Sequence, residues 1–311
     1  MQFVDFQNVH QMLKKTVDTK PDVTAHRWFL DGEGSSESVT WGEFYDQVKQ
    51  AGKSLISLGV EKGDKVIILS YTCYYWVLCD MANATIGAAT VGIYQSNLAE
   101  DCKYIINHSD AVVVFAENQQ QLDKLMQIRD GIPNIRKVIL FNGDAPANDD
   151  WVISFDEFMG LSQNTSEKDL QQRIQMPTPQ DTATIVYTSG TTGVPKGAVI
   201  THDNITFTAQ SVEACVDVRD GDETFLFLPL AHIFARTCVN ATMLAGATTN
   251  YCRSMDTITD DLKVAKPHWF ASVPRIYEKV YSKVLSGAES KGGAALKIFN
   301  WAKDIGDKMA D

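Results

Sequence analysis

The sequence is poor in basic residues relative to acidic ones. Its 311 residues include 28 Lys and Arg against 39 Asp and Glu, which gives a formal net charge of −11. Proteins that bind nucleic acid neutralise phosphates with clustered Lys and Arg, so this balance argues against a nucleic-acid partner. Small anionic ligands are not excluded, because local loops hold them whatever the net charge of the chain.

Cysteine is sparse and shows no paired spacing. The six cysteines, at positions 73, 79, 102, 215, 238 and 252, form no C-x-x-C motif of the kind found in zinc and redox sites. A chain of this length buries about 75% of its unfolded surface and needs no disulfide framework. We therefore expect reduced thiols in the protein core.

We find no sequence signal for export or for membrane insertion. The N-terminus has no basic segment followed by an apolar run, so we expect no signal peptide and a cytoplasmic protein. Residues 71–94 are long enough to span a bilayer, but Asp80 and Asn83 lie near the middle, where a charge is costly. We predict a buried helix followed by a short strand, and at most a peripheral contact with the inner face of a membrane.

Short β-branched runs alternate with amphipathic segments along most of the chain, which predicts an α/β fold of doubly wound, mostly parallel sheets with flanking helices. Thr40, with Glu43 three residues later, forms a capping-box pattern at the start of one helix. By composition, residues 142–150 and 162–181 are predicted to be loops. Strands are predicted at residues 65–70, 89–94, 111–116, 137–141, 184–188, 198–201, 223–228, 247–251 and 267–272.

The tail from Pro274 is predicted to be largely helical. Its apolar residues Ile298, Ala302, Ile305 and Met309 recur at helical spacing and form one stripe. We expect this stripe to be covered by another part of the protein or by a neighbouring chain.

The strongest chemical signal is TIVYTSGTTGVPKGA, residues 184–198. Glycines let backbone N–H groups converge on an anion, hydroxyl groups add short donors, and a lysine adds positive charge. The pattern therefore predicts a polyphosphate-binding loop. It differs from a Walker A loop, because Gly190 and Gly193 are three residues apart and Lys196 is followed by Gly197. A Walker-type phosphotransferase is thus disfavoured.

The segment YTSGTTGVPKG resembles the phosphate-loop signature of the AMP-forming acyl-CoA synthetases, within the acyl-adenylate-forming superfamily. Further segments resemble this family in the same order along the chain: TWGEF, GVEKGDKV, FLPLAHI at residues 227–233 and SVPRIYEKVY at residues 272–281. The last two, with LPLAHIFAR, resemble the long-chain fatty acid–CoA ligase branch. The resemblance covers the N-terminal AMP-binding (adenylation) domain, with a first α/β part at residues 1–180 and a second part, including the loop, at residues 181–311.

The resemblance implies a two-step ligase that uses ATP, Mg²⁺ and coenzyme A. A fatty acid carboxylate would attack the α-phosphate of ATP to give acyl-AMP and pyrophosphate, and the coenzyme A thiol would then displace AMP. Thr188 matches the position that helps to bind Mg²⁺, and His232 matches the active-site histidine beside the acyl carboxylate. We assign no role to Phe234 or Arg236, and we expect Arg275 to be structural. The residues matching those that hold the β- and γ-phosphates are Ser189, Gly190, Thr191, Thr192, Gly193 and Lys196.

Parts of the family pattern are not found in this sequence. These are the adenine-binding aromatic-Gly-x-Thr-Glu motif, the Thr-Gly-Asp motif of the ribose region, and the small C-terminal domain with its catalytic lysine. We therefore expect an incomplete large N-terminal domain, inactive without its missing C-terminal half. The alternative is a non-catalytic nucleotide-binding or interaction module derived from this family.

Overall fold

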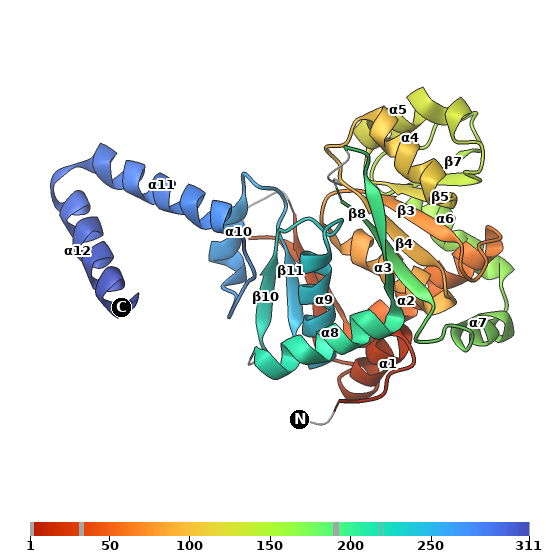
Figure 1. Cartoon of the computed structure of the whole chain (residues 1–311), viewed down its shortest axis with the longest axis horizontal. Helices are drawn as coiled ribbons and strands as arrows, with labels where there is room; N and C mark the ends of the chain where they lie inside the picture. The colour runs from red at the N-terminus through yellow and green to blue at the C-terminus, as the bar shows by residue number, and fades with distance from the viewer. Residues whose placement is uncertain (1–2, 31–33, 189–192, 217, 220, 311) are drawn as a thin grey trace. The chain divides into compact units, whose positions relative to one another are not determined.

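The computed structural model describes residues 3–30, 34–188, 193–216, 218–219 and 221–310 (Figure 1). By its internal contacts the chain divides into two compact units, Met1–Phe270 and Ala271–Asp311. Both β-sheets lie in the first unit, which also carries the candidate site.

A seven-stranded sheet has the order β7-β6-β5-β3-β4-β8-β9. All neighbouring pairs are parallel except β8 and β9, which are antiparallel. The mostly parallel arrangement predicted from the alternating pattern is confirmed. The strands are β3 (Lys65–Leu69), β4 (Ala89–Ile93), β5 (Ala111–Ala116), β6 (Lys137–Leu140), β7 (Val152–Ser154), β8 (Thr182–Thr188) and β9 (Lys196–Thr201).

A second sheet of four strands has the order β10-β11-β1-β2, with β2 antiparallel to β1. Its strands are β1 (Thr24–Phe29), β2 (Ser36–Thr40), β10 (Glu223–Leu226) and β11 (Thr248–Tyr251). Strands from the start of the chain thus join strands near residue 250, while β8 and β9 join the other sheet. A boundary at residue 181 therefore does not coincide with the division between the two sheets.

Helices flank these sheets as expected for an α/β fold (Figure 1). Thr40 and Glu43 form the predicted capping box at the start of α2. Nearly every residue of α3 is buried, and α3 is followed by the strand β4, so the stretch 71–94 is the buried helix and strand that we predicted. The helices of this unit are α1 (Val9–Thr19), α2 (Trp41–Ser57), α3 (Tyr74–Ile86), α4 (Ala99–His108), α5 (Gln119–Ile128), α6 (Phe155–Gly160), α7 (Glu167–Ile174), α8 (His202–Cys215), α9 (Ile233–Ala245) and α10 (Ile258–Ala265), with short 3-10 helices η1 (Arg129–Gly131) and η2 (Leu161–Asn164).

One predicted loop and one predicted strand were wrong. Residues 162–181, predicted to be a loop, contain η2 and α7, because α7 is capped by Ser166 and buries Leu170 and Ile174. Residues 267–272, predicted to be a strand, form a single bridge between Trp269 and Thr224.

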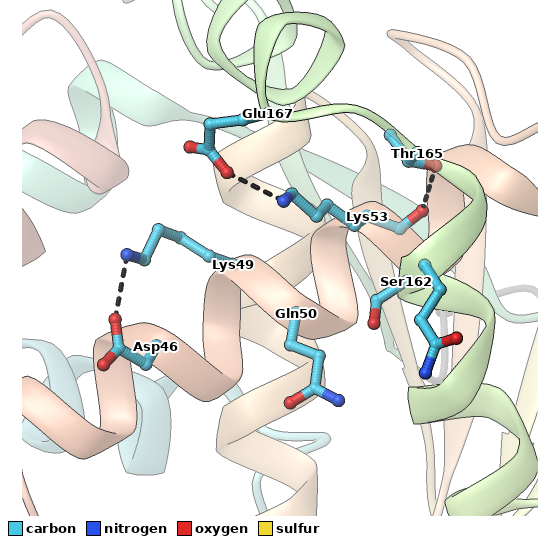
Figure 2. A pocket seen from close by; sticks show the side chains of 8 residues that line it. Asp46, Lys49, Gln50, Lys53, Ser162, Thr165 and Glu167 are labelled. Carbon is cyan, nitrogen blue, oxygen red and sulfur yellow. Dashed lines mark hydrogen bonds and ion pairs between the residues drawn. The ribbon is translucent and has the colours of Figure 1, made fainter.

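Between α2 and the η2–α7 region lies a polar cavity of about 420 Å³, and Figure 2 shows the charged side chains that line it.

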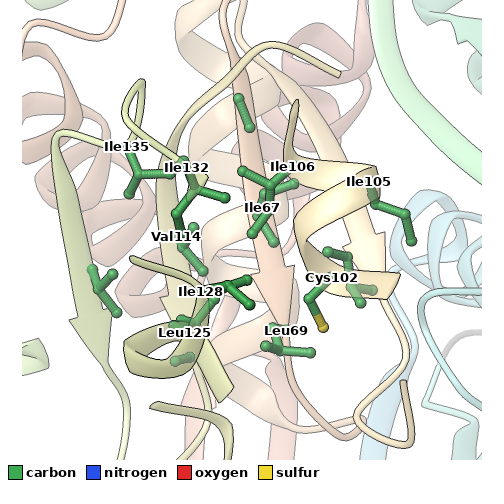
Figure 3. Close-up of a cluster of buried hydrophobic side chains, with 14 of the residues drawn as sticks. Ile67, Leu69, Cys102, Ile105, Ile106, Val114, Leu125, Ile128, Ile132 and Ile135 are labelled. Atoms are coloured by element: carbon green, nitrogen blue, oxygen red, sulfur yellow. The ribbon is translucent and has the colours of Figure 1, made fainter. Parts of the chain in front are cut away.

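The core of the first unit lies where the seven-stranded sheet packs against α4 and α5 (Figure 3). Ile67 and Val114 come from the strands, Ile105 from α4 and Leu125 from α5, and all are buried. Burial of this kind contributes about 25 cal/mol for each Å² of apolar surface removed from water. The packed helices and strands therefore provide a rigid base for the loops at the ends of the strands.

The cysteines are free thiols, as expected, but not all lie in the core. Cys79, Cys102 and Cys252 are buried, whereas Cys215 is exposed, so the expectation of a core position is wrong for Cys215. Burial raises the pKa of the Cys102 thiol to about 11, which keeps it protonated and unreactive at neutral pH.

The second unit consists of α11 (Pro274–Lys291) and α12 (Gly293–Ala310), in agreement with the predicted helical tail. The rings of Tyr281 and Phe299 meet with centroids 5.6 Å apart. Residues of the predicted apolar stripe, Ile298 and Met309, remain exposed. Within the described residues, no helix is long and apolar enough to cross a bilayer.

Candidate active site

The predicted site residues Thr188 and His232 meet at the carboxyl ends of β4 and β8. A cavity of about 440 Å³ lies there. In open α/β sheets, ligands bind outside the carboxyl ends of the strands, because the loops that leave those ends diverge and create a crevice. The cavity is lined by Gly92, Ile93, Tyr94, Asn97, Asp101, Ile105, Val186, Tyr187, Thr188, Pro195 and His232.

The two ends of the predicted phosphate loop are held by the β8–β9 pairing. Thr188 and Lys196 are directly opposite each other in the antiparallel ladder, and both are exposed. Gly193 has a φ of +82°, in the left-handed region that favours glycine. Thr188 and Lys196 therefore mark the two ends of the loop. The predicted phosphate-binding residues Ser189, Gly190, Thr191 and Thr192 lie outside the described residues.

Helix α4 supports both strands that flank the loop. Tyr104 donates a hydrogen bond of 3.0 Å from its hydroxyl to the carbonyl oxygen of Pro195, next to Lys196. One helical turn later, His108 Nδ1 lies 2.7 Å from the hydroxyl of Tyr187, next to Thr188. Burial raises the pKa of Tyr187 to about 12, so its hydroxyl stays neutral and available for this hydrogen bond. The loop is therefore anchored at each end to the same helix.

His232 is positioned by the turn that precedes α9. It caps α9, because its Nδ1 accepts a hydrogen bond of 3.2 Å from the backbone N–H of Phe234. In the neutral ring this leaves Nε2–H as the donor. The hydroxyl of Thr72 donates to the carbonyl of Leu228 at 2.7 Å and accepts from the N–H of Leu230 at 3.1 Å. These bonds fix the turn that carries His232.

Close packing also fixes this turn against β4. A Cβ atom at Gly92 would lie 2.9 Å from the Cα of Ala231, so a larger residue at position 92 would push the turn away. Thr188 and His232 thus stand on elements that pack against the same strand. This rigidity is what a catalytic site needs to hold reacting groups in line.

Arg236, to which we assigned no role, is a structural residue. Its side chain is 4% exposed and forms an ion pair of 2.5 Å with Asp80 of α3. It also hydrogen-bonds Thr184 of β8 and lies over the ring of Trp76. Phe234 is 41% exposed, at the start of α9. Arg275 is exposed on the first turn of α11, and its role stays a prediction.

Asp101 and His232 in the lining of the cavity are of residue types that can ligate a metal ion. The described residues contain no group of three or more His, Cys, Asp or Glu side chains that could hold one. Mg²⁺ that accompanies a nucleotide is commonly held by one or two protein ligands together with phosphates and waters. Thr188 and Lys196 are exposed, and a hydroxyl and an ammonium group are of the kinds that bind a metal ion and a phosphate oxygen, respectively.

Comparison with known proteins agrees with this geometry. The family model described as AMP-binding enzyme matches residues 13–304. The chain belongs to this family. The long-chain-fatty-acid–CoA ligase ACSBG2 of Xenopus laevis is 30% identical over 307 residues, which is 96% of this chain and 41% of that protein. The long-chain-fatty-acid–CoA ligase FadD15 of Mycobacterium bovis is 32% identical over 290 residues, 93% of this chain and 47% of that protein.

Solved structures of low sequence identity share the fold. The A domain of carboxylic acid reductase from Segniliparus rugosus, in complex with AMP and a co-purified carboxylic acid, has a TM-score of 0.80 at 18% identity, covering 95% of this chain and 54% of that one. The N-terminal domain of FACL13 from Mycobacterium tuberculosis has a TM-score of 0.67 at 22% identity, covering 87% of this chain and 64% of that one. The α/β fold expected from the resemblance is confirmed. The chain spans less than half the length of the two CoA ligases.

Sequence reasoning missed several residues of the cavity. Tyr94 ends a predicted strand, and Asn97 and Asp101 follow it, so their position at a carboxyl end was a usable signal. Asp101 also accepts a hydrogen bond of 3.2 Å from the backbone N–H of Leu98, at the start of α4. The support from Tyr104 and His108 had no local signal, because it depends on how α4 packs.

Proposed function

We propose that the chain is the N-terminal part of an AMP-forming long-chain fatty acid–CoA ligase. The observation that carries this proposal is that Thr188 and His232 line one cavity at the carboxyl ends of two strands, next to Lys196. Membership of the AMP-binding enzyme family supports the use of ATP. The relatives named long-chain-fatty-acid–CoA ligases support a fatty acid and coenzyme A as the other substrates.

The proposed chemistry assigns separate tasks to the two sides of the cavity. Lys196, Thr188 and the loop between them bind the β- and γ-phosphates of ATP and neutralise charge as pyrophosphate leaves. Mg²⁺ supplies additional positive charge on the phosphates when it is bound, with Thr188 as one ligand. His232 donates from Nε2 to the fatty acid carboxylate and orients it toward the α-phosphate. Positioning and preorganised charge, rather than a covalent step on the protein, lower the barrier.

The second half-reaction and the site of action are part of the same proposal. Coenzyme A attacks the acyl-AMP, forms the thioester and releases AMP. Contacts to adenine and ribose, and a lysine near the α-phosphate, come from sequence outside residues 1–311, in accord with the missing family motifs. We propose a cytoplasmic reaction, with at most peripheral contact of the protein with a membrane.

The test is ATP–pyrophosphate exchange in the presence of a fatty acid. The protein assayed is residues 1–311 joined to the segment proposed to follow them. Lys196→Ala and Thr188→Val should each slow the exchange, because one preorganised charge contact is worth about 3–4 kcal/mol in the transition state. Lys53→Ala is the matched control, because Lys53 lies in the separate cavity of Figure 2. Exchange at the wild-type rate in both loop variants would refute the assignment.

The 311-residue chain by itself provides the second part of this test. We expect no acyl-CoA from it, because the reacting phosphorus of ATP is not held in line when only the phosphate tail is gripped. Acyl-CoA formation by this chain alone would show that the catalytic residues are misplaced. Binding of ATP by the joined protein without any exchange would favour the non-catalytic module instead.

A further inference from the structure

A second cavity lies on the same edge of the seven-stranded sheet, beside the candidate active site. Its volume is about 370 Å³. It lies at the point where the chain reverses its winding, because β3 leads by way of α3 to β4 on one side, and β5 leads by way of α5 to β6 on the other. Part of the lining comes from residues one or two positions after strand ends: Leu30, Tyr71, Glu117, Asn142 and Cys252.

Aromatic rings form much of the wall. Trp28 and Tyr74 are stacked with centroids 4.4 Å apart and planes 16° apart. Tyr71 is 49% exposed, and Trp28 and Tyr75 are half-buried, so their rings remain partly open to a ligand. The face of an aromatic ring carries negative electrostatic potential and attracts cations within about 6 Å of its centroid.

Glu117 provides a negative charge in this wall. Its Oε2 accepts a hydrogen bond of 2.8 Å from the backbone N–H of Tyr71. In the part of the chain that the structure describes, no Lys, Arg or His side chain forms an ion pair with it. Partial burial raises the pKa of this carboxyl group, which reflects the cost of keeping it charged without a partner.

The positively charged side chain in the lining already forms an ion pair. Arg253 binds Asp261 through Nη2 at 2.6 Å and through Nε at 2.9 Å. Both groups donate to Oδ1 of Asp261, and the pair is neutral as a whole. Glu117 therefore gives the cavity its uncompensated charge.

The polar cavity of Figure 2 shows the contrasting arrangement. There Lys49 lies 2.8 Å from Asp46, and Lys53 lies 2.7 Å from Glu167. Two positive and two negative charges cancel, and no aromatic side chain lines that cavity. It has no comparable preference for a charged ligand, so it supplies control residues.

We propose that the ring-lined cavity binds a small organic cation, a primary or quaternary ammonium compound. Glu117 supplies the opposite charge, and the rings of Trp28, Tyr71 and Tyr75 supply faces for the ammonium group. A cavity of this size accommodates a small molecule. This ligand is separate from the substrates of the proposed ligase, so the inference does not depend on that function.

The test is a ligand-observed NMR titration of the 311-residue chain with choline, whose quaternary ammonium group is a simple probe. The neutral carbon isostere 3,3-dimethylbutan-1-ol is titrated in parallel, because it has the same shape without the charge. We expect choline to bind at least tenfold more tightly than the isostere. Glu117→Gln, which keeps an acceptor for the Tyr71 N–H, should weaken choline binding at least tenfold.

Two further variants complete the design. Trp28→Leu removes one ring face and should also weaken choline binding, whereas Glu167→Gln removes a carboxylate from the cavity of Figure 2 and should leave it unchanged. Circular dichroism checks that each variant is folded. If Trp28→Leu is not folded, the result for Glu117→Gln alone decides. Equal affinity for choline and the isostere, or unchanged choline affinity in Glu117→Gln, would overturn the proposal.

Discussion

At the scale of single residues, one buried ion pair links the elements that carry the candidate site. Asp80 of α3 and Arg236 of α9 have side chains 6% and 4% exposed. Arg236 also bonds Thr184, in the strand that ends at Thr188. Because either charge alone would be costly to bury, the pair holds α3, α9 and β8 together.

Replacing Asp80 by Asn should therefore destabilise the protein strongly. We expect the free energy of unfolding to fall by about 3–5 kcal/mol, since Arg236 would be left buried without its counter-charge. Urea denaturation followed by circular dichroism measures this loss. Lys14→Gln, which breaks an exposed pair with Asp18, is the control and should have little effect. Equal stability of the two variants would show that the buried pair is not holding the helices.

The sequence could reveal one half of this pair. Asp80 stood out as a charge within an apolar stretch, and it correctly argued against a membrane span. Its partner lies 156 residues away, and local sequence reasoning has no means to connect the two. For the same reason, Arg236 could not be given a role until the fold brought it to Asp80.

At the scale of elements, α4 supports the phosphate loop in addition to the β8–β9 pairing. Tyr104 and His108 lie on one face of this helix and reach the residues next to Lys196 and Thr188, respectively. The spacing of four residues places both side chains on that face. The β8–β9 pairing sets the separation of the two loop ends, and α4 braces both of them from one side.

Tyr104→Phe tests this support while it keeps the packing of the ring. A net hydrogen bond is worth about 0.5–1.5 kcal/mol, so we expect the affinity for Mg²⁺–tripolyphosphate to fall about two- to tenfold. Isothermal titration calorimetry with the 311-residue chain measures it. Tyr277→Phe on α11, where the side chain is 58% exposed, should leave the affinity unchanged. An unaltered affinity in Tyr104→Phe would mean that α4 does not hold the loop.

The elements differ in how far their sequences predict them. β5 has the predicted bounds, because a continuous β-branched run is a strong local signal. α7 was missed because its buried face consists of Leu170 and Ile174 in an otherwise polar segment. β1 was missed because it is stabilised by pairing with β11, for example His26 with Thr249, far along the chain.

At the scale of the whole molecule, the fold brings distant segments to one edge of the seven-stranded sheet. The resemblance of the loop and of the His232 motif predicted the residues. The turn that carries His232 follows β10 of the other sheet and packs on Gly92 of β4, which explains why His232 shares a cavity with Thr188 at the end of β8. The second, ring-lined cavity could not be predicted, since its walls come from both sheets. The chain spans less than half the length of its CoA ligase relatives, so we expect it to bind the phosphate part of ATP without completing the reaction.

The central claim is that residues 188–196 form a polyphosphate site beside His232. The most direct measurement is calorimetric titration of the 311-residue chain with Mg²⁺–tripolyphosphate, in the wild type, in Lys196→Ala and in the control Lys53→Ala. A charge-assisted hydrogen bond contributes about 1.5–3 kcal/mol, so we predict binding by the wild type and the control, and at least tenfold weaker binding by Lys196→Ala. No binding by the wild type, or equal binding by Lys196→Ala, would contradict the account.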